Sequence, residues 1–194
     1  MRFAVLGSGS QGNGTLIASA DTYVLVDCGF SLRETEKRLL RLGVNPAQLS
    51  AILVTHEHAD HVHGVGLLSR RYNLPVYLSQ GTLRGMRKPV EAAGFVRGGE
   101  QLQIVALCID VIAVAHDAQE PTQFVFSDGQ RRFGLLTDLG SYCTGVLEGY
   151  RGLDALMIEA NHCRDLLARG YYPYFLKQRV GGDQGHLNNH QAAS

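Results

Sequence analysis

The stretch Ala-Ile-Leu-Val-Thr-His-Glu-His-Ala-Asp-His, residues 51–61, determines how this chain is interpreted. Three His and one Asp follow directly after an apolar run, and four of the chain's eight His lie between positions 56 and 63. Alternation along an extended segment turns His56 and His58 to the same side, whereas the adjacent Asp60 and His61 diverge towards a second point. Such side chains at fixed offsets are typical ligands of two divalent cations. A solvated, His-rich loop is the alternative interpretation, but it would not require this spacing.

Length and composition predict a single domain that covers residues 1–194. The chain is 45% apolar, which is enough for one substantial core, and no Pro/Ser-rich linker or block of charge divides it. The apolar stretch at residues 1–6 is too short for a signal peptide or a transmembrane span. We therefore expect a cytoplasmic protein that does not associate with membranes, and the oligomeric state stays open.

The charge balance limits how a polyanion could be bound. The chain has 18 basic and 18 acidic residues, so it exerts no global attraction on nucleic acid, and any polyanionic substrate must be held locally. Three pairs of cations could grip phosphates or could simply be solvated surface: Arg70/Arg71, Arg87/Lys88 and Arg131/Arg132.

The cysteines indicate a reduced protein. Cys28, Cys108, Cys143 and Cys163 are scattered and form no Cys-x-x-Cys pair. We expect free and mostly buried thiols, and we expect neither a disulfide framework nor metal ligation by sulfur.

A glycine motif near the N-terminus suggests a different function. Residues 7–12, Gly-Ser-Gly-Ser-Gln-Gly, match the dinucleotide-binding fingerprint and follow a strand-like run. That fingerprint needs a helix next, yet residues 15–18 and 23–26 are short β-prone runs separated by a turn. The pattern favours a β-hairpin over a nicotinamide or flavin site.

Hydrophobic periodicity predicts a mixed α/β order of elements. Helices are expected from Ser31, which can cap a helix with Glu34 closing the capping box, to Gly43, then at 61–73, 81–88, between 137 and 154, and from about Asn188. Strands are expected at 1–6, 15–18, 23–26, 51–54, 75–79, 102–115, 124–126, 132–136 and 155–158. Several strands end on polar residues, which places the chemistry on loops at one end of a sheet.

These motifs together resemble the metallo-β-lactamase-fold hydrolases over essentially the whole chain, and within them the bacterial YycJ/WalJ group. The resemblance rests on residues 7–13, 55–61, 137–140 (Thr-Asp-Leu-Gly), 159–162 (Glu-Ala-Asn-His) and 185–189 (Gly-His-Leu-Asn-Asn). It implies a four-layer αββα sandwich. That group is described as directed at nucleic acid, with 5′-to-3′ exonuclease activity on double-stranded DNA as its assigned role.

The resemblance also implies a set of ligands. His56, His58 and His116 would hold one metal ion, Asp60 and His61 a second, and Asp138 would bridge the two. Zinc is the expected metal, although His and carboxylate ligands also suit manganese and iron. A hydroxide shared by two such cations could attack phosphorus in line with the departing oxygen, and Asp60 could orient it. Asp27 lacks a matching ligand geometry, so we expect it to hydrogen-bond the His-rich loop.

Glu159 and His186 resemble a Glu and His pair in the tRNA 3′-processing nucleases of this fold, where the His protonates the leaving alkoxide. The alternative is that His186 caps or packs the helix near Asn188. His162 could support the same site or add a ligand. We expect His63 to support the ligands or to have no role, and we expect His190 to lie on the surface.

The chain departs from the family pattern at its end. In related sequences a final strand ends in a His that completes the second metal site, whereas this sequence ends at Ser194. We therefore expect a sandwich that lacks its C-terminal strand. Either the gene product is shortened, or the second cation has only Asp60, His61 and Asp138 with solvent, helped by His162 or His186, and is bound less tightly.

The sequence thus predicts a binuclear metal-dependent phosphodiesterase that acts on nucleic acid, with DNA exonuclease activity. Two alternatives stay open. One is a hydrolase of the same fold that acts on a small phosphodiester or thioester. The other is a catalytically impaired metal-binding regulatory module.

Overall fold

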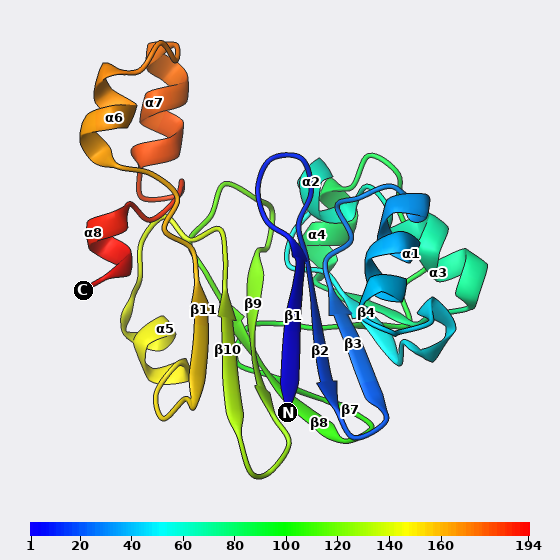
Figure 1. Cartoon of the computed structure of the whole chain (residues 1–194). Helices are drawn as coiled ribbons and strands as arrows, with labels where there is room; N and C mark the ends of the chain where they lie inside the picture. Colours follow the sequence, from blue (N-terminus) through cyan, green and yellow to red (C-terminus); the bar gives the residue numbers. More distant parts are fainter.

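Two β-sheets packed face to face form the centre of the computed structural model, which describes residues 1–194 (Figure 1). The first sheet has the order β1-β2-β3-β4-β5-β6 and the second the order β11-β10-β9-β8-β7. The first sheet consists of β1 (Arg2–Gly7), β2 (Gly14–Ser19), β3 (Thr22–Val26), β4 (Ala51–Leu53), β5 (Val76–Leu78) and β6 (Gly94–Phe95). The second consists of β7 (Gln101–Ile104), β8 (Leu107–Ala113), β9 (Thr122–Ser127), β10 (Arg132–Leu136) and β11 (Ala155–Ile158).

The pairing changes direction inside each sheet. Strands β1 to β3 are antiparallel, and β3 to β6 are parallel. Strands β7 to β10 are antiparallel, whereas β10 and β11 are parallel. Consequently β8, β10 and β11 all run in the same direction, and the residues that follow them emerge at one end of the second sheet.

Alternating side chains of the first sheet contribute to two separate hydrophobic cores. Leu25 and Ile52 pack on the outer face against helices α1 (Leu32–Arg41) and α3 (Val65–Tyr72), together with Leu39 and Leu68. Their neighbours on the same strands, among them Val24 and Leu53, pack on the inner face against the second sheet, in a core that also contains Phe124 and Phe126. Strand periodicity therefore supplies both interfaces of the first sheet.

The outer face of the second sheet is covered by α5 (Thr144–Gly149), where Val146 packs with Leu136, Leu139 and Leu187. The layers are thus helix, sheet, sheet and helix, which confirms the predicted αββα sandwich. Shorter elements complete the chain: α2 (Ala59–Val62), α4 (Gln80–Gly85), α6 (Arg164–Arg169), α7 (Tyr174–Gly181), α8 (Asn189–Ala192) and the 3₁₀ turn Pro46–Gln48.

The helix predicted at 61–73 is broken into two helices, α2 and α3, so the prediction of one continuous helix was wrong. The break falls at Gly64, whose N–H donates to Cys28 O at 2.7 Å. A Cβ atom at Gly64 would lie 2.2 Å from Phe30 O, so only glycine allows this close approach. The tight packing of two chain segments overrides the helical pattern here.

Three other predictions needed smaller corrections. The strand material at 102–115 is two strands, which turn at Val105, a residue with φ of 47°. The helix expected at 81–88 spans Gln80–Gly85. Ser31 does cap α1 by accepting from Glu34 N at 3.3 Å, but the Glu34 carboxylate pairs with Arg38 at 2.8 Å instead of closing the capping box.

The cysteines are all free, as expected, but only Cys28 is buried. The expectation of mostly buried thiols was therefore wrong. Cys108 lies on β8 between the inward-facing Leu107 and Ile109, and alternation turns it outward. Cys143 is exposed at the N-cap of α5.

Helices α6 and α7 were not predicted, and in Figure 1 they project from the sandwich beyond the end of β11. Neither helix contains a buried residue. No helix in the structure is both long and apolar enough to cross a membrane.

Candidate metal centre

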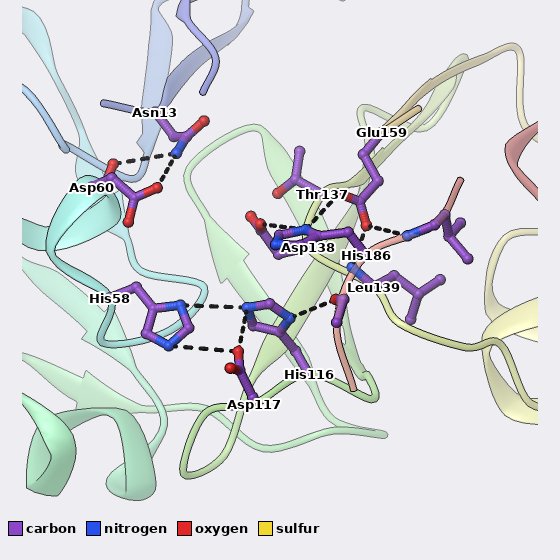
Figure 2. Close-up of polar contacts among 12 residues, drawn as sticks. Asn13, His58, Asp60, His116, Asp117, Thr137, Asp138, Leu139, Glu159 and His186 are labelled. Atoms are coloured by element: carbon purple, nitrogen blue, oxygen red, sulfur yellow. Dashed lines mark hydrogen bonds and ion pairs between the residues drawn. The ribbon is translucent and has the colours of Figure 1, made fainter. Parts of the chain in front are cut away.

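The loops that leave β4, β8, β10 and β11 meet at one end of the sandwich. They carry residues 55–61, His116, Asp138 and Glu159, and the segment that follows α7 adds His186. Figure 2 labels six of these side chains, which gather from different loops: His58, Asp60, His116, Asp138, Glu159 and His186. The candidate side chains therefore lie on loops at one end of the sheets, where the sequence predicted them.

Ligand atoms converge in three overlapping clusters, in each of which they lie within 4.8 Å of one another. The clusters are His56 with His58 and His116, His56 with His61 and Asp138, and Asp138 with Glu159 and His186. The first is the predicted three-His set. Asp138 belongs to the other two, with Oδ2 at 3.1 Å from His61 Nε2 and Oδ1 at 3.3 Å from His186 Nδ1.

The hydrogen bonds of the imidazoles fit cation binding. His61 Nδ1 donates to Asp27 Oδ2 at 2.8 Å, and His116 Nδ1 donates to Gly185 O at 3.0 Å. His56 Nδ1 lies 2.9 Å from Thr55 Oγ1, whose hydroxyl donates to Asp27. All three rings therefore turn Nε2 to the centre, where His58 presents Nδ1 at 2.9 Å from His56 Nε2. This tautomer pattern leaves lone pairs for divalent cations.

Charge states of the rings follow from their surroundings. Burial, reinforced by the neighbouring His61, holds the pKa of His56 well below its usual range, and burial also lowers the pKa of His116. These two imidazoles are therefore neutral, which is the form that binds a cation. Burial also disfavours charge on His61, but the charges and hydrogen bonds of Asp27 and Asp138 outweigh it and raise its pKa to about 10. Either a proton or a metal ion at this ring balances the two carboxylates.

Asp27 supports the His-rich loop, as predicted. Its carboxylate accepts from Thr55 N and Thr55 Oγ1, each at 2.8 Å, in addition to the bond from His61. Asp27 and Asp138 both have positive φ, at 60° and 53°. A left-handed backbone is uncommon for residues with a side chain, and such residues cluster at functional sites where the surrounding contacts hold them.

Asp60 lies at the edge of the centre. Its Oδ2 is 3.6 Å from His61 Nε2 and accepts from Asn13 Nδ2 at 3.0 Å, but Asp60 belongs to none of the three clusters. Asn13 N also donates to Asp60 O at 2.7 Å. The glycine-rich loop thus positions Asp60, and the dinucleotide interpretation is wrong because the chain continues into β2 and not into a helix.

Glu159 connects three loops. Its Oε1 accepts from Leu139 N at 2.6 Å and from Leu187 N at 3.2 Å, and its Oε2 lies 3.0 Å from His186 Nδ1. Burial lowers the pKa of His186, but the hydrogen bond and charge of Glu159, together with Asp138, outweigh burial and raise it. His186 does not cap the last helix, because Asn188 accepts from His190 N and Gln191 N there.

Three further imidazoles are placed outside the clusters. His63 is exposed at the end of α2, and His190 is exposed on α8, as expected for a surface residue. His162 is half-buried, and its Nδ1 is enclosed without a hydrogen-bond partner.

Sequence reasoning missed a group of residues that hold the ligands in place. Asp117 Oδ1 lies 3.3 Å from His116 Nε2, and the Arg179 guanidinium of α7 donates to Asp117 Oδ2. Glu57 Oε1 accepts from Gln119 N at 2.7 Å and so ties the His-rich loop to the loop that carries His116. The position of Glu57 and Asp117 next to predicted ligands is the only signal in the sequence that could have pointed to them.

Comparison with known proteins identifies the class. Residues 7–170 match the family model of the metallo-beta-lactamase superfamily. The chain belongs to this superfamily, and with the convergent His and Asp side chains it is a metal-dependent hydrolase.

Similar proteins show which group within the superfamily this chain resembles. The chain is 35% identical to the exodeoxyribonuclease YycJ of Bacillus anthracis over 100% of this chain and 75% of that protein. It is 34% identical to the exodeoxyribonuclease WalJ of Streptococcus pneumoniae over 99% of this chain and 74% of that protein. The predicted resemblance to the YycJ/WalJ group is therefore confirmed.

Solved structures agree on the fold. The metallo-beta-lactamase fold protein YhfI from Bacillus subtilis superposes with a TM-score of 0.72 at 20% identity, covering 98% of this chain and 78% of that chain. The Zn²⁺-bound PqqB from Methylobacterium extorquens superposes with a TM-score of 0.74 at 15% identity, covering 97% and 81%. Both likenesses concern the architecture alone.

Proposed function

We propose that this protein is a phosphodiesterase that degrades nucleic acid, with 5′-to-3′ exonuclease activity on DNA. The single observation that supports this most is the continuity of the site, in which a three-His cluster, the shared Asp138 and the Glu159–His186 pair are neighbours. The similarity to two exodeoxyribonucleases over the full chain supports the same activity. We propose further that residues 1–194 work as one domain in the cytoplasm.

Two divalent cations, zinc first among the candidates, fit the donor set. His56, His58 and His116 would hold one, and His61 with Asp60 would hold the other, while Asp138 would contribute to both. Bound there, the cations would supply Lewis acidity at the phosphoryl oxygens and would make a water molecule acidic enough to lose its proton near neutral pH. Asp60, held by Asn13, would orient the attacking water.

His186 would act as the general acid. Glu159 holds Nδ1 of this ring and favours its protonated form, so the proton needed by the leaving oxygen is available beside Asp138. Glu159 itself is held by two backbone N–H groups, which keeps the pair oriented. The chain thus provides its own proton donor for an alkoxide that leaves poorly.

The test uses purified protein and three substrates: DNA labelled at its 5′ end, DNA labelled at its 3′ end, and bis(p-nitrophenyl) phosphate. We expect early release of the 5′ label as mononucleotide, and hydrolysis of the aryl diester that a chelator abolishes. His58→Ala should remove the metal measured by elemental analysis, and the exposed His190→Ala serves as the matched control. A protein without bound metal, or one that cleaves thioesters but no phosphodiester, would contradict the proposal.

The number of cations is tested separately. Asp138→Ala should lower the stoichiometry from two ions towards one, because the shared carboxylate is removed while the three-His cluster stays intact. Elemental analysis of wild type and variant gives the ratio. Retention of two ions with unchanged hydrolysis of the aryl diester would refute the bridging role.

A further inference from the structure

Helices α6 and α7 form an exposed hairpin that carries an unusual density of aromatic side chains. Tyr171, Tyr172, Tyr174 and Phe175 lie in its turn and at the start of α7, and each is at least 60% exposed, with Tyr171 fully exposed. Large apolar side chains gathered on a projecting element mark an interaction site, because exposure to water gives them no stability.

The same hairpin is locally basic. Residues 162–181 contain four cations, Arg164, Arg169, Lys177 and Arg179, and one anion, Asp165, which gives a net charge of +3 (four minus one) with His neutral. The whole chain has a net charge of zero. Positive charge is therefore concentrated on this element, and it complements a polyanion.

A hollow of about 340 Å³ opens on the hairpin. Arg164, Lys177 and Tyr174 line it, as does His162, whose Nδ1 is the enclosed atom without a partner. Two cations, an aromatic ring and an imidazole thus line one concavity, which suits a phosphate with its attached base.

The base of the hairpin is fastened to the metal centre. Arg179 binds Asp117, which neighbours His116, and His186 N donates to Val180 O at 2.9 Å. Gly185 supplies the acceptor for His116 and packs so closely that a Cβ atom there would lie 2.2 Å from Arg179 O. The eight residues of α7 then span about 12 Å from this anchor to the aromatic turn.

We propose that the α6–α7 hairpin is a stacking platform for a single-stranded segment of the nucleic acid substrate, which it holds beside the metal centre. Aromatic faces stack on unpaired bases of any sequence, while the basic side chains follow the phosphates. A reach of about 12 Å spans at most roughly three to four nucleotides, because about 3.4 Å is the rise per nucleotide of a strand stacked as in duplex DNA. The inference rests on the proposed nuclease function. It identifies the hairpin as the surface by which the protein prefers a nucleic-acid strand to a small phosphodiester.

Binding is measured by fluorescence polarisation with a single-stranded 12-mer, a blunt duplex and a dinucleotide, all in metal-loaded protein. Tyr171→Ala/Tyr172→Ala should weaken binding of the 12-mer roughly 5- to 150-fold, as expected when one base loses its stacking partner. Arg164→Glu/Arg169→Glu should reduce the slope of log affinity against log salt by about 0.7 for each phosphate that is no longer neutralised. Phe95→Ala on the edge strand β6 and Arg33→Glu/Arg41→Glu on α1 are matched controls, because these residues are also exposed but lie outside the hairpin.

Turnover separates this inference from the proposed function. All variants should hydrolyse bis(p-nitrophenyl) phosphate and the dinucleotide at the wild-type rate, since both substrates are too short to reach the aromatic turn. If wild type binds and cleaves DNA but the hairpin variants match the controls, the platform is refuted while the nuclease stands. If wild type cleaves no phosphodiester, the proposed function itself fails. Self-association that the Tyr variants abolish, with DNA binding unchanged, would assign the surface to a second copy of the chain and overturn the inference.

Discussion

The two sides of the metal centre are held in opposite ways. On the first sheet, Asp27, Thr55 and His61 are at most 3% exposed and hydrogen-bond one another without solvent. On the other side, α6 and α7 contain no buried residue and are fastened mainly at their base, through Arg179 and Val180. Ligand geometry is thus fixed by burial, whereas the surface offered to the substrate keeps its side chains in water.

The largest expected effect breaks the buried side. Asp27→Ala should lower the free energy of unfolding by about 3–5 kcal/mol, because it removes the acceptor of three buried donors and the partner of His61. Urea unfolding measures the decrease. Asp27→Asn tolerates the left-handed backbone and keeps the side-chain shape, so it should cost less. A decrease below about 1 kcal/mol for Asp27→Ala would mean that burial does not hold this side together.

His186 tests the junction between the two sides. His186→Ala should lower turnover of DNA by about a hundredfold or more, because the alkoxide would leave without a proton. An activated aryl phosphodiester should be affected far less, since its leaving group needs no proton. Steady-state kinetics on both substrates, with metal content as the control, give the ratio. Equal decreases on the two substrates would make His186 a ligand or a packing residue.

The titration of the buried Cys28 thiol tests the contrast between the buried and the exposed side of the metal centre. Burial raises the pKa of Cys28 from 9.0 to about 11, with Thr35 opposing and Asp27 adding to the shift. The folded state therefore binds this proton more tightly than the unfolded state, so its contribution to stability is complete below pH 9 and disappears as the pH rises from 9 to 11. The decrease should be roughly 2–3 kcal/mol. Urea unfolding at pH 8 and at pH 11 should show this extra decrease in wild type and in the exposed control Cys143→Ala, but not in Cys28→Ala.

The smallest expected effect lies on the exposed side. Tyr171→Ala should change the free energy of unfolding by less than about 0.5 kcal/mol, because the ring is fully exposed. Thermal unfolding should shift by no more than about 2 °C. A clearly larger shift would show that the hairpin contributes to the fold and would weaken the contrast between the two sides.

Short, continuous apolar runs made the central strands of the first sheet predictable from the sequence, since both faces of this sheet are buried. The ligand motif was readable for a similar reason, because residues 56–61 are close in sequence and in space. The break at Gly64 was not readable, since it depends on contact with Phe30 and Cys28, which lie more than thirty positions earlier. Helices α6 and α7 bury no face, so no period of apolar residues marks them.

The residues that position the candidate ligands could not be predicted from the sequence, for a further reason. Asn13, Arg179 and Gly185 reach the site from loops and a helix whose positions are set by tertiary packing. Asp60 shows the same limit, because the motif predicts a ligand while its distance from the clusters depends on Asn13 and the glycine-rich loop. The sequence predicted which side chains lie close together, whereas tertiary packing determines the distance of each one from the candidate metal clusters.

The bond from His116 to Gly185 has a consequence for motion. A cation at His116 Nε2 keeps the proton on Nδ1, and this proton is what holds the carbonyl of Gly185. Metal binding should therefore slow the opening of the segment 180–186 at the base of the hairpin, and amide hydrogen exchange there should report on occupancy. Such coupling is reciprocal. If metal binding raises the affinity of the hairpin for a nucleic-acid strand, the bound strand would raise the affinity for the metal by the same factor.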